Sequence, residues 1–235
     1  MTLYNAQPQG DPRRGHWLNF SPNPGQVQHD FCGAHDIAGA TCPYCNKPLL
    51  RILSLSAEDP VLNLEQGKTP VVHLLYCWTC SIPFGEFSYR INADGSVEFV
   101  HVPERQHDRE FGLAGPFDGY KGVYPLCKVS LEPMDEQDDA KLARRAHEEG
   151  DEEYDDLFAP RHQVGGSPFI YNPKTLTCPG CSTNMPVLAA ICDHASGNNP
   201  WQPDESNSFT GNGGAQMVFQ FCRDCAIVSA YHSCD

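Results

Sequence analysis

The sequence has no long apolar segment and little positive charge. No apolar run approaches the roughly 18 residues that a transmembrane helix needs, so we expect no membrane span. Residues 1–20 are polar and lack the apolar core of a signal peptide, which predicts a cytoplasmic protein. The 16 Lys and Arg residues are outnumbered by 30 Asp and Glu, which gives a formal net charge of −14. Because phosphate binding depends on clustered Lys and Arg, we do not expect nucleic acid to be the principal ligand.

The common sequence motifs of catalysis are also missing. None of the ten histidines lies in a His-Glu-x-x-His arrangement, and the chain has neither a Gly-x-Ser-x-Gly elbow nor a phosphate-binding loop. The sequence therefore predicts a protein that is not an enzyme.

Cysteine is plentiful, with 12 residues in the chain. Eight of them form four Cys-x-x-Cys pairs, at Cys42/Cys45, Cys77/Cys80, Cys178/Cys181 and Cys222/Cys225. One such pair supplies half of a tetrahedral zinc site, so four pairs predict two structural Zn²⁺ sites of four cysteines each. In a reducing compartment these thiols stay available for metal rather than forming disulfides.

The four pairs recur in the same order in the two halves of the chain. In each half a Cys-Pro-x-Cys pair precedes an apolar run, a polar loop follows, and a second apolar run leads directly into the next pair. The apolar runs are 49–55 and 71–76 in the first half and 185–191 and 216–221 in the second, with further strand-like runs at 84–91, 97–101 and 227–232. This repetition predicts an internal duplication, with each repeat forming its own zinc ribbon. Pairing of cysteines across the repeats stays open as a less economical alternative.

These patterns predict a mainly β fold (α+β with few helices), made of two duplicated β-rich halves that each contain a zinc-ribbon-like four-cysteine site. A turn at 92–95 predicts a hairpin. Gly165 and Gly166 are expected to need positive φ or close packing. The predicted segments are an irregular arm (1–30), a first zinc-binding repeat (31–131), an acidic helix and linker (132–160, with the helix over 135–149) and a second zinc-binding repeat (161–235).

Negative charge is concentrated between the two repeats. Twelve acidic residues and only three basic ones lie between Glu132 and Asp156. The simpler interpretation is a solvated hinge, and the alternative is a docking surface for a basic protein partner. The candidate partner-binding residues are Glu148, Glu149, Asp151, Glu152, Glu153, Asp155 and Asp156.

The second half resembles the YwqG-like family and the related programmed cell death protein 2 family. The resemblance rests on Val164-Gly165-Gly166-Ser167-Pro168, on Cys178-Pro179-x-Cys181 running into Met185-Pro186-Val187-Leu188, and on the late strand that enters Cys222-x-x-Cys225. Residues 42–89 look like a more divergent copy that lacks the Gly-Gly-x-Pro opening. The resemblance implies a β-rich, duplicated protein without catalytic residues, acting as a chaperone-like escort for a basic client. An immunity protein that neutralises a toxin by direct binding is the alternative.

Two other chemistries stay open. Cys42-Pro43-Tyr44-Cys45 matches the glutaredoxin active-site tetrapeptide, but a strand-like run follows it where a thiolate-stabilising helix would be needed. A dithiol oxidoreductase using Cys42 and Cys45 is therefore the second functional alternative. Four remaining residues at predicted strand ends could form a further metal site, although ordinary structural roles are favoured: Cys192, His194, His232 and Cys234.

Overall fold

The described part of the chain contains eleven β-strands. In the computed structural model, placement is described for residues 14–64, 69–77, 86–102, 124–138, 162–170, 172–192 and 215–234. The strands are β1 (His16–Asn19), β2 (His29–Phe31), β3 (Leu50–Ser56), β4 (Val71–Tyr76), β5 (Phe87–Ile91), β6 (Val97–His101), β7 (Cys127–Pro133), β8 (Gln163–Val164), β9 (Val187–Cys192), β10 (Ala215–Cys222) and β11 (Ile227–Cys234), with a 3₁₀ turn, η1 (Pro60–Leu62), after β3.

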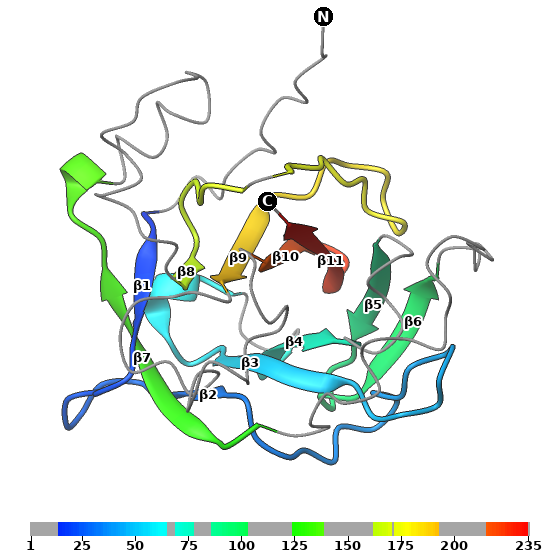
Figure 1. The fold of residues 1–235 in the computed structure, drawn as a ribbon, viewed down its shortest axis with the longest axis horizontal. Coiled ribbons are helices and arrows are strands. Elements are labelled where there is room, and N and C mark those ends of the chain that lie inside the picture. The colour runs from blue at the N-terminus through cyan, green and yellow to red at the C-terminus, as the bar shows by residue number, and fades with distance from the viewer. Residues whose placement is uncertain are drawn as a thin grey trace, which may run out of the picture.

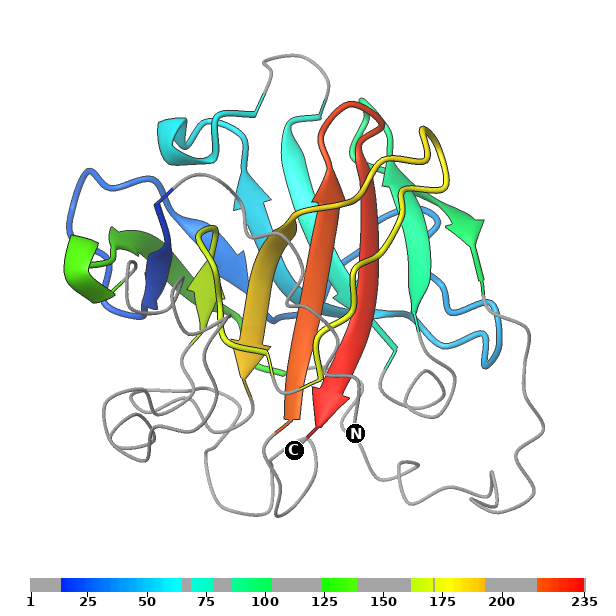
Figure 2. The same cartoon turned by 90° about the horizontal axis from the view of Figure 1, so that it is seen from above.

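All eleven strands belong to one sheet, in the order β4-β3-β2-β7-β1-β8-β9-β10-β11-β5-β6. The sheet curls, so that β3 and β4 lie opposite β9, β10 and β11 (Figures 1 and 2). Every strand pairing is antiparallel. Curling lets one sheet act as both walls of a core, which is how a single antiparallel sheet can bury one of its faces.

The main core fills the space inside the curl. Phe31, Leu53 and Leu74 from one wall belong to the same buried cluster as Phe219 and Ala230 from the opposite wall. A smaller cluster covers the outer face of β9, β10 and β11, where the segment after β8 packs over the sheet. Its members are Ile170, Leu176, Val187, Val218 and Tyr231.

The prediction of a mainly β chain is confirmed, as is the hairpin between β5 and β6, whose turn places Gly95 at φ +82°. The two predicted repeats do not form separate sheets, however. β5 and β6 come from the first half of the chain, yet β5 pairs with β11 of the second half. No helix among the described residues is long and apolar enough to cross a membrane.

The prediction of an irregular arm over residues 1–30 is wrong for residues 16–19. These residues form β1, which pairs with β7 on one side and β8 on the other. Only four residues long, β1 gave no periodic signal, and its position depends on partners far away in the sequence. Of the predicted helix over 135–149, residues 136–138 are helical, Asp135 directly precedes the helix, and residues 139–149 lie outside the described residues.

Two modules of the sheet have matching hydrogen bonds; we define the first as residues 29–80 and the second as residues 162–225. In the first, the Ser56 amide donates to Nδ1 of the buried His29 over 3.1 Å. In the second, the Cys192 amide donates to Nδ1 of the buried His162, also over 3.1 Å. His29 begins β2 and His162 directly precedes β8, so in both modules a histidine at the start of a short strand bonds to the last residue of the following long strand.

The modules also share a β-bulge. The matching register pairs are Arg51↔Leu75 and Leu53↔Leu74 in the first module, and Val187↔Gln220 and Ala189↔Phe219 in the second. One residue is skipped on the earlier strand in each case, Ile52 in β3 and Leu188 in β9. A bulge of this kind bends a strand and fixes its register.

The first module has the backbone conformation of the Gly-Gly opening without its sequence. Gly165 and Gly166 have φ of +70° and +62°, which confirms their predicted conformation. Cys32 and Gly33 stand at the corresponding place, with φ of +58° and +88°. The Cys32 amide donates to Ile52 O, as the Gly165 amide does to Leu188 O. The opening predicted to be lacking from the first half is therefore present as a conformation.

Side chains close the curl where strand pairing stops. The Leu75 amide donates to the Tyr89 hydroxyl over 2.8 Å, and that hydroxyl donates to His73 O, also over 2.8 Å. The Tyr76 hydroxyl is hydrogen-bonded to Nδ1 of His232 on β11 over 2.9 Å. The buried Tyr89 hydroxyl thereby gives hydrogen-bond partners to backbone groups at the edge of β4. Buried backbone N–H and C=O groups require such partners.

We expect acid to destabilise the fold partly through His73, whose Nδ1 lies 2.8 Å from Ser54 Oγ. Burial, followed by the charges of His35 and Arg51, lowers the pKa of His73 from 6.5 to about 4. The folded protein keeps this imidazole neutral. The contribution of His73 to the free energy of unfolding is therefore complete above pH 6.5, and it is lost as the pH falls from 6.5 towards 4. The full shift corresponds to roughly 3 kcal/mol.

Urea unfolding at pH 7 and pH 5 tests this. Between those pH values wild type should lose roughly 2 kcal/mol more free energy of unfolding than the variant His73→Asn, which cannot titrate. Any acid-induced loss of metal affects both proteins and cancels in the comparison. An identical pH dependence of the two proteins would contradict the assignment.

Candidate metal centres

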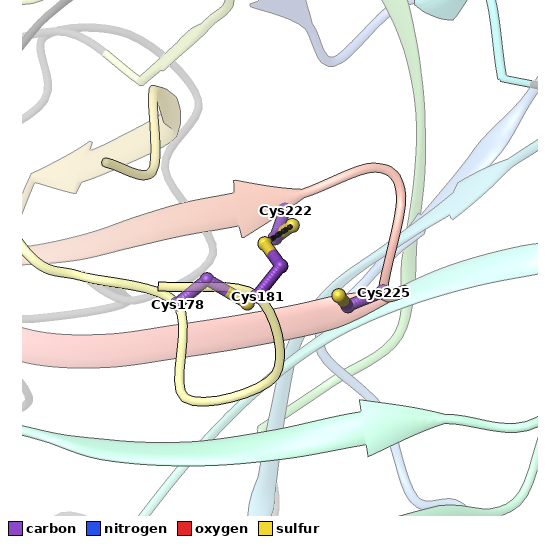
Figure 3. Close-up of side chains that lie close together, drawn as sticks. All are labelled: Cys178, Cys181, Cys222 and Cys225. Atoms are coloured by element: carbon purple, nitrogen blue, oxygen red, sulfur yellow. Dashed lines mark hydrogen bonds between the residues drawn. The ribbon is translucent and has the colours of Figure 1, made fainter. Parts of the chain in front are cut away.

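In the second module four cysteine sulfurs converge at one end of the β10–β11 hairpin. Cys178 and Cys181 lie in a turn closed by a bridge between Thr177 and Asn184. Cys222 ends β10, and Cys225 lies in the turn before β11. The four sulfurs all lie within 4.8 Å of one another (Figure 3). We call this group the second cluster.

In the first module three cysteine sulfurs converge in the same way. Cys42 and Cys45 lie in a turn closed by a bridge between Thr41 and Pro48, and Cys77 directly follows β4. Their sulfurs also lie within 4.8 Å of one another. Cys80, the predicted fourth member, lies outside the described residues. We call this group the first cluster.

Both Cys-Pro-x-Cys turns have the same backbone. The Cys178 amide donates to Thr183 O and the Ser182 amide donates to Cys178 O, with Ser182 at φ +62°. In the first module the matching bonds are Cys42 N–H to Lys47 O and Asn46 N–H to Cys42 O, with Asn46 at φ +56°. Asparagine tolerates this left-handed conformation better than most residues. The tight turn brings both side chains of a pair to the same side of the chain.

The sulfur spacing suits a tetrahedral metal ion. Cys45 Sγ lies 3.7 Å from Cys77 Sγ, and Cys181 Sγ lies 3.6 Å from Cys222 Sγ. Sulfurs at the corners of a tetrahedron with metal–sulfur distances of about 2.3 Å would be separated by roughly 3.8 Å. The observed separations exceed the disulfide bond length of about 2.05 Å. Both clusters could therefore hold a metal ion.

Hydrogen bonds and burial give the thiols of the second cluster different affinities for protons. The Thr183 hydroxyl lies 3.0 Å from Cys181 Sγ, and hydrogen bonds from Thr183 lower the pKa of the Cys181 thiol. Burial raises the pKa of the Cys222 and Cys225 thiols. The Gly180 amide donates to Cys178 Sγ over 3.3 Å. A cation that binds all four sulfurs must displace protons, so binding depends on pH.

Apolar side chains pack against the buried cysteines of the second cluster. Cys178 and Cys222 are buried together with Met185 and Ile227, and Val100 of β6 packs against the same group. Gly180 passes so close that a Cβ at this position would lie 2.9 Å from Cys225 Sγ and 3.0 Å from Ile227 Cδ1. The turn therefore has no room for a side chain at residue 180.

The two clusters lie at opposite ends of the curled sheet. The second cluster adjoins the start of β11, at Ile227. The first cluster adjoins Tyr76, which is bonded to His232, five residues further along β11. Five residues of extended strand span roughly 17 Å. The two groups are therefore independent sites rather than one shared centre.

The structure brings together seven of the eight predicted metal ligands, grouped within each module rather than across the modules. The acidic candidates for partner binding, Glu148 to Asp156, lie outside the described residues. Cys192 and His232 do not meet, because β10 runs between their strands and His232 bonds to Tyr76. His194 is not among the described residues, and Cys234 is described only as a backbone position in β11. Among the described residues, only the two cysteine clusters gather three or more metal-ligating side chains.

Sequence reasoning missed Thr183, Gly180, His29 and His162. The two histidines had a signal, because His29-Asp30-Phe31-Cys32-Gly33 aligns with His162-Gln163-Val164-Gly165-Gly166. Thr183 had none, since only the folded turn places its hydroxyl beside Cys181.

Replacing Gly180 by alanine should weaken metal binding at the second cluster only. The added Cβ forces a shift of Cys225 or Ile227, and overpacking of this kind costs roughly 1–3 kcal/mol. Competition with a chromophoric chelator measures metal affinity. Tyr44→Ala, at the matching position of the first turn, is the control because a side chain is native there. Unchanged affinity at the second cluster in Gly180→Ala would contradict this packing argument.

Comparisons with known proteins assign no family to this chain. No protein-family model matches it, no curated protein is similar to it, and no solved structure matches its fold. The geometry of the two clusters is therefore the main indication of function.

Proposed function

We propose that each cluster binds one structural Zn²⁺ through four cysteine thiolates. The ligands would be Cys42, Cys45, Cys77 and Cys80 in the first site, and Cys178, Cys181, Cys222 and Cys225 in the second. The observation that carries the proposal is the convergence of sulfurs from separate strand ends at separations suited to tetrahedral zinc. Cys80 follows Cys77 at the same spacing as Cys225 follows Cys222, which supports its inclusion.

We infer that the two modules are copies of one ancestral unit. Matching turns, bulges and histidine contacts at corresponding positions support this inference. A shared origin also explains why the ligands of each site come from within one module.

Sites of this kind are closed, so the metal would hold shape and perform no reaction. A catalytic zinc keeps a coordination position open for water, whereas four thiolates fill all of them. Zinc binding would then contribute directly to folding free energy. The metal would join the start of β3 to the end of β4, and the start of β9 to the end of β10, where the cysteine turns lie.

On this basis the protein would act by binding another protein, as a chaperone-like escort for a basic client. Its net charge of −14 supports a basic partner, because opposite charge speeds association. The oxidoreductase alternative is disfavoured because residues 46–56 contain a bridge and a strand and no helix to stabilise a Cys42 thiolate.

Metal analysis tests the zinc sites. Protein purified without added metal should contain about two Zn²⁺ per chain. Cys222→Ser should reduce this to about one and Cys77→Ser likewise, while Cys127→Ser, outside both clusters, should leave it unchanged. Fewer than one zinc in wild type, with all thiols free, would refute both sites.

Co-purification followed by mass spectrometry tests the partner. A basic protein should co-elute in stoichiometric amount, and its affinity should fall as salt rises. Neutralising the seven acidic candidates between residues 148 and 156 to Asn or Gln should weaken binding. A matched variant that neutralises seven exposed acidic residues elsewhere is the control: Asp36, Glu58, Asp94, Glu98, Glu132, Asp135 and Glu136. Equal effects of the two variants would exclude residues 148–156 as the docking surface, and a toxin as the recovered partner would favour the immunity alternative.

A further inference from the structure

The second cluster differs from the first in the exposure of one ligand. Cys181 is exposed to solvent, whereas Cys178 and Cys222 are buried and Cys225 is half-buried. In the first cluster Cys42 and Cys77 are buried and Cys45, which corresponds to Cys181, is half-buried. Among the described cysteines of the two clusters, solvent therefore reaches Cys181 most freely.

Sequence differences within the turn account for this exposure. Tyr44 precedes Cys45, and both pack against the main core. Gly180 precedes Cys181, and packing against Cys225 and Ile227 leaves no room for a side chain there. Without a neighbouring aromatic ring, the turn of the second module leaves Cys181 open.

A second thiol, which could form a disulfide with Cys181, lies beside the Cys181 thiol. Cys222 Sγ is 3.6 Å from Cys181 Sγ. A disulfide requires about 2.05 Å, so the two sulfurs need to approach by only roughly 1.5 Å. Cys181 belongs to an exposed turn, whereas Cys222 ends a buried strand, so the movement falls to Cys181.

We propose that Cys181 is an oxidation site at which a peroxide releases the metal of the second cluster. This inference rests on the proposed zinc sites. The Cys181 thiolate attacks one oxygen of hydrogen peroxide, the O–O bond breaks, hydroxide leaves and a sulfenic acid forms. The Cys222 thiolate then attacks the Cys181 sulfur, a second hydroxide leaves, and a disulfide joins the two residues. Two electrons pass from the two sulfurs to the peroxide.

The disulfide removes two of the four ligands. Cys178 and Cys225 alone cannot complete a tetrahedral site, so the zinc dissociates. The first cluster keeps its metal, because its described ligands are buried or half-buried. Oxidation would therefore act on one end of the sheet, where the second cluster packs against Val100 of β6.

Limited peroxide treatment of the full zinc-loaded chain tests this. Zinc release is followed with a chromophoric chelator, and disulfides are mapped by peptide mass spectrometry after blocking free thiols. We expect one of the two zinc ions to be lost first, together with a disulfide between Cys181 and Cys222, and the loss to be reversed by a thiol reductant and added zinc. Zinc measured before treatment separates the outcomes, since its absence refutes the zinc sites rather than the oxidation.

Two results would overturn the proposal in protein that contains zinc: release of both ions at one rate, or a first disulfide that excludes Cys181. Cys181→Ser should lose the Cys181–Cys222 disulfide and the fast phase of release, and Cys127→Ser, the control, should retain both. If Cys181→Ser binds no zinc at the second cluster, competitive labelling of wild type with a limiting alkylating reagent decides the matter. Cys181 should then be modified before the other seven ligands, and preferential modification of any of those seven contradicts the proposal.

Discussion

The fold depends on the meeting of two cysteine turns that are separated in sequence by a pair of strands and lie at the same end of that pair. In each module one turn precedes the first long strand and the other follows the second, so the sulfurs meet only if the strands pair in one register. A slip by one residue would turn every side chain of the strand to the other face. The bulges opposite Leu74 and Phe219 fix that register, and the sulfur separations of 3.6 and 3.7 Å are its result. Metal binding would add to this constraint by favouring the same register.

The two modules make one sheet because their short strands meet through a central pair. β2 pairs with β7, β8 pairs with β1, and β1 pairs with β7, so the order β4-β3-β2-β7 is matched by β10-β9-β8-β1. The match ends at the outer edge. β10 continues the sheet through β11, whereas β4 meets the hydroxyl of Tyr89 at Leu75 and His73. Replacing a strand by a tyrosine leaves room for the curl to close around the core.

Patterns within the sequence predicted the long strands other than β7 (Cys127–Pro133), and they predicted the grouping of the cysteines, because both leave local signals. Alternation from Gly85 to Ile91 and the turn at Gly95 are sufficient to predict the β5–β6 hairpin. The short strands β1, β2 and β8 leave no such signal, and their positions follow from contacts between segments far apart in the sequence, such as Trp17 with Glu132 and Phe31 with Cys127. The pairing that joins the two halves into one sheet was not predicted for the same reason, since nothing local shows that β5 will pair with β11.

The exposure of Cys181 was equally beyond sequence analysis, although both residues that cause it are visible there. Tyr44 and Gly180 occupy the same position in two turns of the same backbone, and only the structure shows that one packs on the core and the other against Cys225. Two cysteine turns with matching backbone hydrogen bonds can therefore differ in solvent access through one neighbouring residue. Because a thiolate reacts only with reagents that reach it, this difference permits one site to hold the fold while the other responds to its surroundings.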